Sequence, residues 1–193
     1  GATTSISIYA KWTLNNYSIT YNGNSNSSGS APSSGSADFN STYTVASNSG
    51  VLVRTGYTFG GWNTLANGSG TNYTAGTGSL TMGSANLTLY AKWNINTYTV
   101  TYDGNSNTGG TVPVDASSPY NYNSTVTAKT NSGTLVRNGY TFAGWNTAAN
   151  GSGTDYAANG TATFTLGAAN VTLYAKWTAN SYTVTYSYNS ATG

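Results

Sequence analysis

The chain has 193 residues, of which 5% are charged and 37% are hydrophobic, and its formal net charge is +2. Its 17 Tyr, 5 Trp and 4 Phe supply more apolar surface than a disordered polar segment contains, so we expect a folded protein. Six cations scattered along the sequence cannot neutralise a run of phosphates, and no apolar run approaches the ~20 residues of a membrane-spanning helix. We therefore expect neither a nucleic-acid partner nor membrane insertion.

The residue inventory gives little support to catalysis. The sequence contains no His, Cys or Glu, so a general base, a thiolate nucleophile and most of the usual metal ligands are missing. We expect no enzyme, no catalytic residue, no metal site and no cofactor. Because Gln is also absent while Thr, Tyr and Val are abundant, strands are favoured over helices nearly everywhere.

The first predicted element is a strand at residues 6–12, where apolar residues alternate and which ends in the string YAKW at Trp12. The same string ends at Trp93 and again at Trp177, at intervals of about eighty residues. The sequence is therefore an internal repeat. We divide it into a closing strand of one repeat (1–12), two complete repeats (13–93 and 94–177) and the opening strand of another (178–193).

Each YAKW is followed by a predicted opening strand, at residues 17–21, 98–102 and 182–186, in which Tyr, Ile or Val alternates with Ser or Thr. Such alternation is typical of a half-buried strand. A loop rich in Gly, Ser and Asn then follows in the two complete repeats, over residues 23–38 and 104–119.

The best-matched stretches of the two repeats are VLVRTGYTFGGWNT at residues 51–64 and TLVRNGYTFAGWNT at residues 134–147. Small residues between the Phe and the Trp of each motif predict a β-bulge that re-aims Trp62 and Trp145. The shared string ANGSGT comes next, and its Asn-Gly pair predicts a hairpin turn.

A short strand around Leu80, or Phe164 in the second copy, precedes the predicted closing strands at residues 87–93 and 171–177. Alternation in the closing strands puts the Trp on one face and Tyr90 or Tyr174 on the other, together with a lysine that we expect to be solvated. The predicted repeat core gathers aromatic and apolar residues from all these strands: Trp12, Tyr57, Phe59, Trp62, Trp93, Tyr98, Val100, Tyr102, Tyr140, Phe142, Trp145 and Trp177.

The combination of GYTFxGWNT, a terminal YAKW and a following YTVTY resembles the Listeria-Bacteroides repeat, a family similar to the B repeat of internalins, and the resemblance covers essentially the whole chain. It implies an all-β fold of small β-grasp-like modules with little or no helix, strung in a tandem elongated array. It also implies an extracellular location, in secreted or cell-surface bacterial proteins, and no catalytic residues.

Two hypotheses of function follow from this resemblance. The first is a semi-rigid spacer, stalk or extracellular fibre subunit, whose partners are the neighbouring repeats and further copies of itself. The second is an adhesin module that binds a glycan or a surface receptor through exposed Tyr90 and Tyr174 with their Asn neighbours. Tyrosine is also the commonest filler of a pleated surface, so these two positions leave both hypotheses open.

Overall fold

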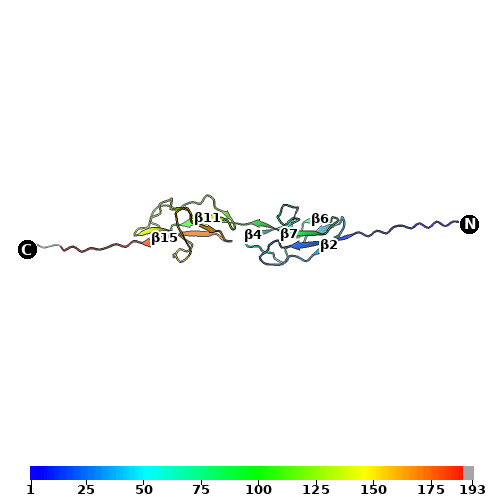
Figure 1. Cartoon of the computed structure of the whole chain (residues 1–193), viewed down its shortest axis with the longest axis horizontal. Helices are drawn as coiled ribbons and strands as arrows, with labels where there is room; N and C mark the ends of the chain where they lie inside the picture. Colours follow the sequence, from blue (N-terminus) through cyan, green and yellow to red (C-terminus); the bar gives the residue numbers. More distant parts are fainter. Residues whose placement is uncertain (189–193) are drawn as a thin grey trace, which may run out of the picture. The chain divides into compact units, whose positions relative to one another are not determined.

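A computed structural model describes residues 1–188 of the chain. These residues form strands β1 to β15 and no helix, which confirms the all-β class with little or no helix (Figure 1). The β-grasp relationship stays a prediction. The chain divides into two compact units, the first running from Gly1 to Ile95 and the second beginning at Asn96.

The first unit is built on a five-stranded sheet in the order β2-β1-β7-β4-β5. Strands β1 and β7 are parallel, with Ile19 opposite Leu87, and all other neighbours are antiparallel. A separate antiparallel pair, β3 with β6, completes the unit. The strands are β1 (Asn16–Asn22), β2 (Gly35–Asp38), β3 (Thr42–Thr44), β4 (Tyr57–Asn63), β5 (Asn72–Tyr73), β6 (Ser79–Thr81) and β7 (Leu87–Ile95).

The second unit repeats this arrangement with one strand interrupted. Its main sheet has the order β13-β12-β15-β9, with β9 parallel to β15, and two-stranded sheets join β10 to β8 and β11 to β14. Strands β8 and β9 together occupy the sequence position of β1, because β10 pairs with β8 as β2 pairs with β1. The strands are β8 (Thr97–Tyr98), β9 (Val100–Asp103), β10 (Tyr120–Asn121), β11 (Thr125–Thr127), β12 (Tyr140–Asn146), β13 (Asp155–Tyr156), β14 (Thr163–Thr165) and β15 (Val171–Ala179).

Each core is centred on the Trp of the GWNT motif. In the first unit the Trp62 ring is fully buried, meets the Tyr21 ring edge-on at 4.7 Å, and donates its Nε1–H to the Ala46 carbonyl at 2.8 Å. Trp145 is placed identically, 4.7 Å from Tyr102. Removing an indole from water contributes about 4–6 kcal/mol, so these side chains are the largest single apolar contributions to each small core.

The predicted bulge is confirmed in both repeats. The β4–β7 register shifts between Phe59 and Trp62, and the β12–β15 register shifts at the equivalent point. Gly61 adopts φ 105° there, and a Cβ on it would lie 2.5 Å from the Tyr73 carbonyl oxygen, so only glycine fits. The irregularity leaves Trp62 and Asn63 buried in succession, where a regular strand would expose one of them.

Most of the predicted core residues do lie in or against the two cores, but three do not. Trp12 is 89% exposed, Tyr140 is exposed and Tyr57 is half-buried outside the core cluster, and the two tyrosines lie beneath the guanidinium groups of Arg137 and Arg54. The prediction for these three residues is wrong. The two tyrosines stand at the start of their strands, where the arginine ring contact replaces core packing.

The exposure of Trp12 follows from strand pairing. Residues 1–12 form no strand, and residues 182–186, predicted as an opening strand, form none either and carry the exposed Tyr182, Val184 and Tyr186. A strand exists only through backbone pairing, and these segments have no pairing partner within residues 1–188. The last five residues of the predicted 178–193 segment lie outside the described part of the chain.

Candidate functional site

The hairpin after each buried Trp is organised by the Asn of the GWNT motif. Asn63 is fully buried, and its Nδ2 donates to the carbonyl oxygens of Gly68 (3.1 Å) and Gly70 (3.0 Å) and to Oδ1 of Asn72 (2.8 Å). Its Oδ1 accepts from the backbone N–H of Leu65 (2.8 Å) and of Gly70 (3.1 Å). One side chain thus satisfies loop groups that strand pairing cannot reach.

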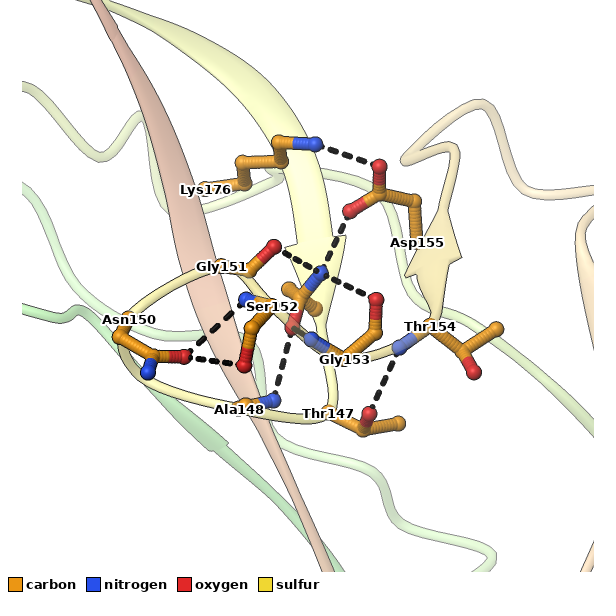
Figure 2. Close-up of polar contacts among 10 residues, drawn as sticks. Thr147, Ala148, Asn150, Gly151, Ser152, Gly153, Thr154, Asp155 and Lys176 are labelled. Atoms are coloured by element: carbon orange, nitrogen blue, oxygen red, sulfur yellow. Dashed lines mark hydrogen bonds and ion pairs between the residues drawn. The ribbon is translucent and has the colours of Figure 1, made fainter.

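The second repeat builds the same loop around Asn146, whose Nδ2 donates to the carbonyl oxygens of Gly151 and Gly153, and Figure 2 shows the loop from Thr147 to Asp155. Here the third acceptor is Oδ1 of Asp155, 2.6 Å from Nδ2, because Asp155 stands where the first repeat has Asn72. The other carboxylate oxygen of Asp155 pairs with the Lys176 ammonium. That lysine bond, followed by the Asn146 bond, lowers the pKa of the Asp155 carboxyl.

A polar turn after the opening strand closes the other side of the loop. Asn24 adopts φ 49° and donates its backbone N–H to Oδ1 of Asn22 at 2.8 Å, an Asx-type turn. Its side-chain Nδ2 donates to the carbonyl oxygens of Ala66 (2.7 Å) and Ala91 (2.9 Å). The turn, the hairpin loop and β7 are therefore fixed to one another, and Asn105 makes the same three contacts in the second repeat.

These three segments border an open surface pocket in each repeat. In the first unit its volume is about 230 Å³, and Arg54, Lys92, Asn24, Asn67 and Trp93 line it. In the second unit the volume is about 280 Å³, and the lining includes the equivalent residues: Arg137, Lys176, Asn105, Asn150 and Trp177. The two repeats thus present the same concave feature, with an arginine and a lysine at each.

The cations of the two pockets differ in their partners. The Arg54 guanidinium lies 4.3 Å from the centre of the Tyr57 ring and makes one long contact, 3.5 Å, to the Asn24 carbonyl. Within residues 1–188 the Lys92 ammonium makes no hydrogen bond or ion pair, whereas Lys176 is paired with Asp155. The first pocket is therefore the more positive of the two.

Tyr90 and Tyr174, the predicted ligand-facing residues, are half-buried on the β7 and β15 faces opposite the core. Tyr90 stands opposite Asn63 in the β4–β7 register, two residues before Lys92. Neither tyrosine lines the pocket, although the lysine of the same strand does.

Sequence reasoning missed both the buried asparagines and the convergence of the cations. Asn63 and Asn146 recur inside GWNT, and this recurrence of a polar residue directly after a buried Trp was a usable indication. Arg54 and Lys92 are far apart in the chain, so only the strand order brings them to one pocket. Among residues 1–188, no group of three or more His, Cys, Asp or Glu side chains is placed to hold a metal ion.

Comparison with known families agrees with this duplicated architecture. The family model of the Listeria-Bacteroides repeat domain matches residues 17–92 and 98–176. The chain belongs to this family. Each match begins within the opening strand and ends one residue before the Trp of YAKW, so one Listeria-Bacteroides repeat comprises one complete sheet with its hairpin loop and pocket.

Relatives of this Listeria-Bacteroides repeat chain include two proteins of Evansella cellulosilytica. One, whose name suggests a Gly-rich membrane protein, is 39% identical over 176 residues, which is 90% of this chain and 20% of the relative. The other, whose name suggests a membrane protein, is 36% identical over 178 residues, or 90% of this chain and 24% of the relative. The chain thus spans a quarter or less of the length of these relatives.

The family and the names of the relatives are consistent with a repeat region of surface proteins. None of the described residues forms a helix with the length and hydrophobicity needed to cross a membrane.

Proposed function

We propose that this chain is a non-enzymatic segment of a secreted or cell-surface protein, in which its repeats act as a semi-rigid spacer. The observation that carries the proposal is the short connection between two copies of one folded unit. Strand β7 ends at Ile95 and β8 begins at Thr97, so Asn96 alone separates them. A connection of this length restricts swivelling far more than a flexible linker of several residues would.

The low charge of the chain supports the same role. Only 5% of its residues are charged, so the repeats offer few groups that salt screens or pH titrates. A spacer outside the cell has to keep its dimensions when ionic strength and pH change. The absence of His, Cys and Glu from the sequence supports a non-enzymatic role.

Small-angle scattering tests the spacer proposal. We expect the maximum dimension to grow by a constant increment when a third and a fourth repeat are appended to the chain. A matched variant with six Gly/Ser residues inserted after Asn96 should keep both units folded. Its flexible connection should spread the distances between the units, so that the maximum dimension no longer grows by a constant increment per repeat. A compact particle whose dimension does not depend on the insertion would contradict the proposal.

A role as a fibre subunit would require the repeats of different chains to associate through their sheet edges. The edge strands of the first sheet, β2 and β5, have four and two residues, and short edges of this kind pair poorly with other chains. We therefore expect a monomer in sedimentation experiments at micromolar concentration. Filaments that form in a concentration-dependent manner in electron micrographs would contradict this expectation and support the role of a fibre subunit instead.

The adhesin hypothesis remains as a second candidate, because the Tyr90 and Tyr174 rings are only half-buried on the outer sheet face. Its test is a glycan-array screen of the chain and of the Y90A/Y174A variant. Binding that disappears in the variant would support it. An array without hits, or hits that the variant retains, would remove these tyrosines from consideration.

A further inference from the structure

We propose that each repeat binds the carboxylate of an acidic sugar in the pocket between the hairpin loop and the closing strand. The proposal goes beyond the spacer role and does not depend on it. Four of the six cations of the chain converge on the two pockets, as the pairs Arg54 with Lys92 and Arg137 with Lys176. No carboxylate lines either pocket.

The cations of the first pocket are available to a ligand. Within residues 1–188 Lys92 has no hydrogen-bond or ionic partner, and Arg54 uses its guanidinium only for the Tyr57 ring and one long contact to Asn24. A guanidinium has five N–H donors in a planar fork, and an ammonium has three. Together they can hold both oxygens of one carboxylate with charge-assisted hydrogen bonds.

The remaining walls suit a sugar ring better than a bare anion. The Trp93 indole provides an apolar wall, fixed in place because its Nε1–H donates to the carbonyl oxygens of Gly23 (3.1 Å) and Asn24 (3.0 Å). Asn67 also lines the pocket; its Oδ1 accepts from Ser69, and its Nδ2 donates to no other described residue. An indole can cover the C–H face of a sugar, and a free amide can bind its hydroxyl groups.

The size and rigidity of the pocket agree with this ligand class. Volumes of about 230 and 280 Å³ lie below the ~300 Å³ at which pockets for drug-sized ligands begin, so one sugar unit is the appropriate scale. Both amide hydrogens of Asn24 are held, by Ala66 and Ala91, so the pocket floor does not have to be ordered when a ligand binds.

A natural difference between the repeats ranks the two sites. Lys176 is paired with Asp155, whereas the position equivalent to Asp155 in the first repeat is occupied by the neutral Asn72. A ligand of the second pocket has to compete with the Asp155 carboxylate for the ammonium. The first pocket should therefore bind an acidic sugar several-fold more tightly than the second.

The two sites can be observed separately in one sample by NMR. The indole Nε1–H signals of Trp93 and Trp177 report on the first and second pockets, and that of the exposed Trp12 reports on neither. The full chain is titrated with trigalacturonate, with the neutral trigalactose and with inorganic phosphate. We expect saturable shifts of Trp93 and Trp177 with trigalacturonate alone, Trp93 at the lower concentration, and weakening at high salt.

Single-charge variants locate the binding. K92Q and R54Q should each weaken binding at Trp93 about ten-fold and leave Trp177 unchanged, since each removes charge-assisted hydrogen bonds. K11Q removes the same charge from a residue outside both pockets and is the matched control, with no expected change. D155N should raise the affinity at Trp177 toward that at Trp93, and N72D should lower the affinity at Trp93.

The outcomes that overturn the proposal are equally specific. Equal shifts with trigalactose would show that the charge pair plays no part. Phosphate binding as tight as trigalacturonate binding would show that the pocket takes anions without regard to a sugar. An unchanged affinity in K92Q, or an equal loss in K11Q, would show that any binding lies elsewhere or follows net charge alone.

Discussion

Replacing Asn63 by alanine tests how far one buried amide determines the hairpin loop. The two amide hydrogens of Asn63 are shared among three acceptors and its Oδ1 accepts two bonds, so about four full hydrogen bonds at a net contribution of about 1 kcal/mol each set an upper value near 4 kcal/mol. Water can reach part of the loop in the variant and satisfy some of these groups. We therefore expect N63A to lower the free energy of unfolding of the first unit by about 2–4 kcal/mol.

This loss is large for a unit of this size. A folded domain of about eighty residues has a free energy of unfolding of about 4–12 kcal/mol, so N63A would remove a substantial part of it. Guanidinium denaturation followed by the indole NMR signals of Trp62 and Trp145 measures each unit separately, because each signal belongs to one core. The second unit, with Asn146 intact, serves as the internal reference.

N67A is the matched control for N63A. Asn67 is an exposed residue of the same loop whose side chain makes only two bonds, both to Ser69, so we expect a change below about 1 kcal/mol. A loss in N63A of less than about 0.5 kcal/mol, or a loss in N67A equal to that in N63A, would refute the reasoning that the buried amide organises the loop.

Three further predictions follow. G61A should destabilise the first unit by at least about 2 kcal/mol in denaturation, because its Cβ would lie 2.5 Å from the Tyr73 carbonyl oxygen at φ 105°, while G68A, at φ 78° in open space, should cost less. Burial raises the pKa of the Asp115 carboxyl, but hydrogen bonds from Tyr120, Lys129 and Ser117 outweigh this effect, so the net pKa is lowered. The ionised carboxylate therefore stabilises the second unit above its unfolded pKa near 3.8, and this stabilisation is lost as the pH falls through the lower folded pKa. In acid titrations the D115N variant should not show this loss of stability. Burial and then the hydrogen bond to Tyr43 raise the pKa of Tyr21 from 10.0 to about 12. The neutral phenol therefore stabilises the first unit fully below pH 10.0, and this stabilisation is lost as the pH rises toward 12. In alkaline titrations the Y21F variant should not show this loss of stability.

Each of these predictions has an outcome that contradicts it. Equal stability of G61A and G68A would mean that the bulge backbone adapts without strain. An acid transition of the second unit that is the same in D115N and in the unaltered chain would assign the pH dependence to another carboxylate. An alkaline transition that Y21F retains would assign it to another tyrosine.

The strands and the bulge were predictable because they depend on local rules. Alternation of apolar and polar residues fixed the opening and closing strands, and the glycine before Trp62 predicted the register shift that the structure contains. Trp12 failed as a core residue for a non-local reason. Its strand pattern is as good as that of Trp93, but residues 1–12 have no pairing partner among the described residues.

The pocket was not predictable from spacing because it is produced by strand order. Arg54 precedes β4 and Lys92 lies in β7, and these strands are neighbours although the chain between them forms β5 and β6. In the sequence the six cations are dispersed, and this dispersal concealed the two pairs that converge in the structure. The buried role of Asn63 depends in a similar way on the folded hairpin, since its hydrogen-bond partners Gly68, Gly70 and Asn72 follow it in the loop and in β5.

Recurrence within one chain distinguishes residues that the fold requires from residues that it does not. Gly61 and Asn63 recur in the second repeat as Gly144 and Asn146, where they again stand at the bulge and hold the hairpin loop. Lys92 also recurs, as Lys176, yet its ammonium has no partner within residues 1–188 and lines a pocket without carboxylates. If K92Q leaves the free energy of unfolding unchanged while it weakens trigalacturonate binding, stability does not account for the recurrence of this lysine, and ligand binding does.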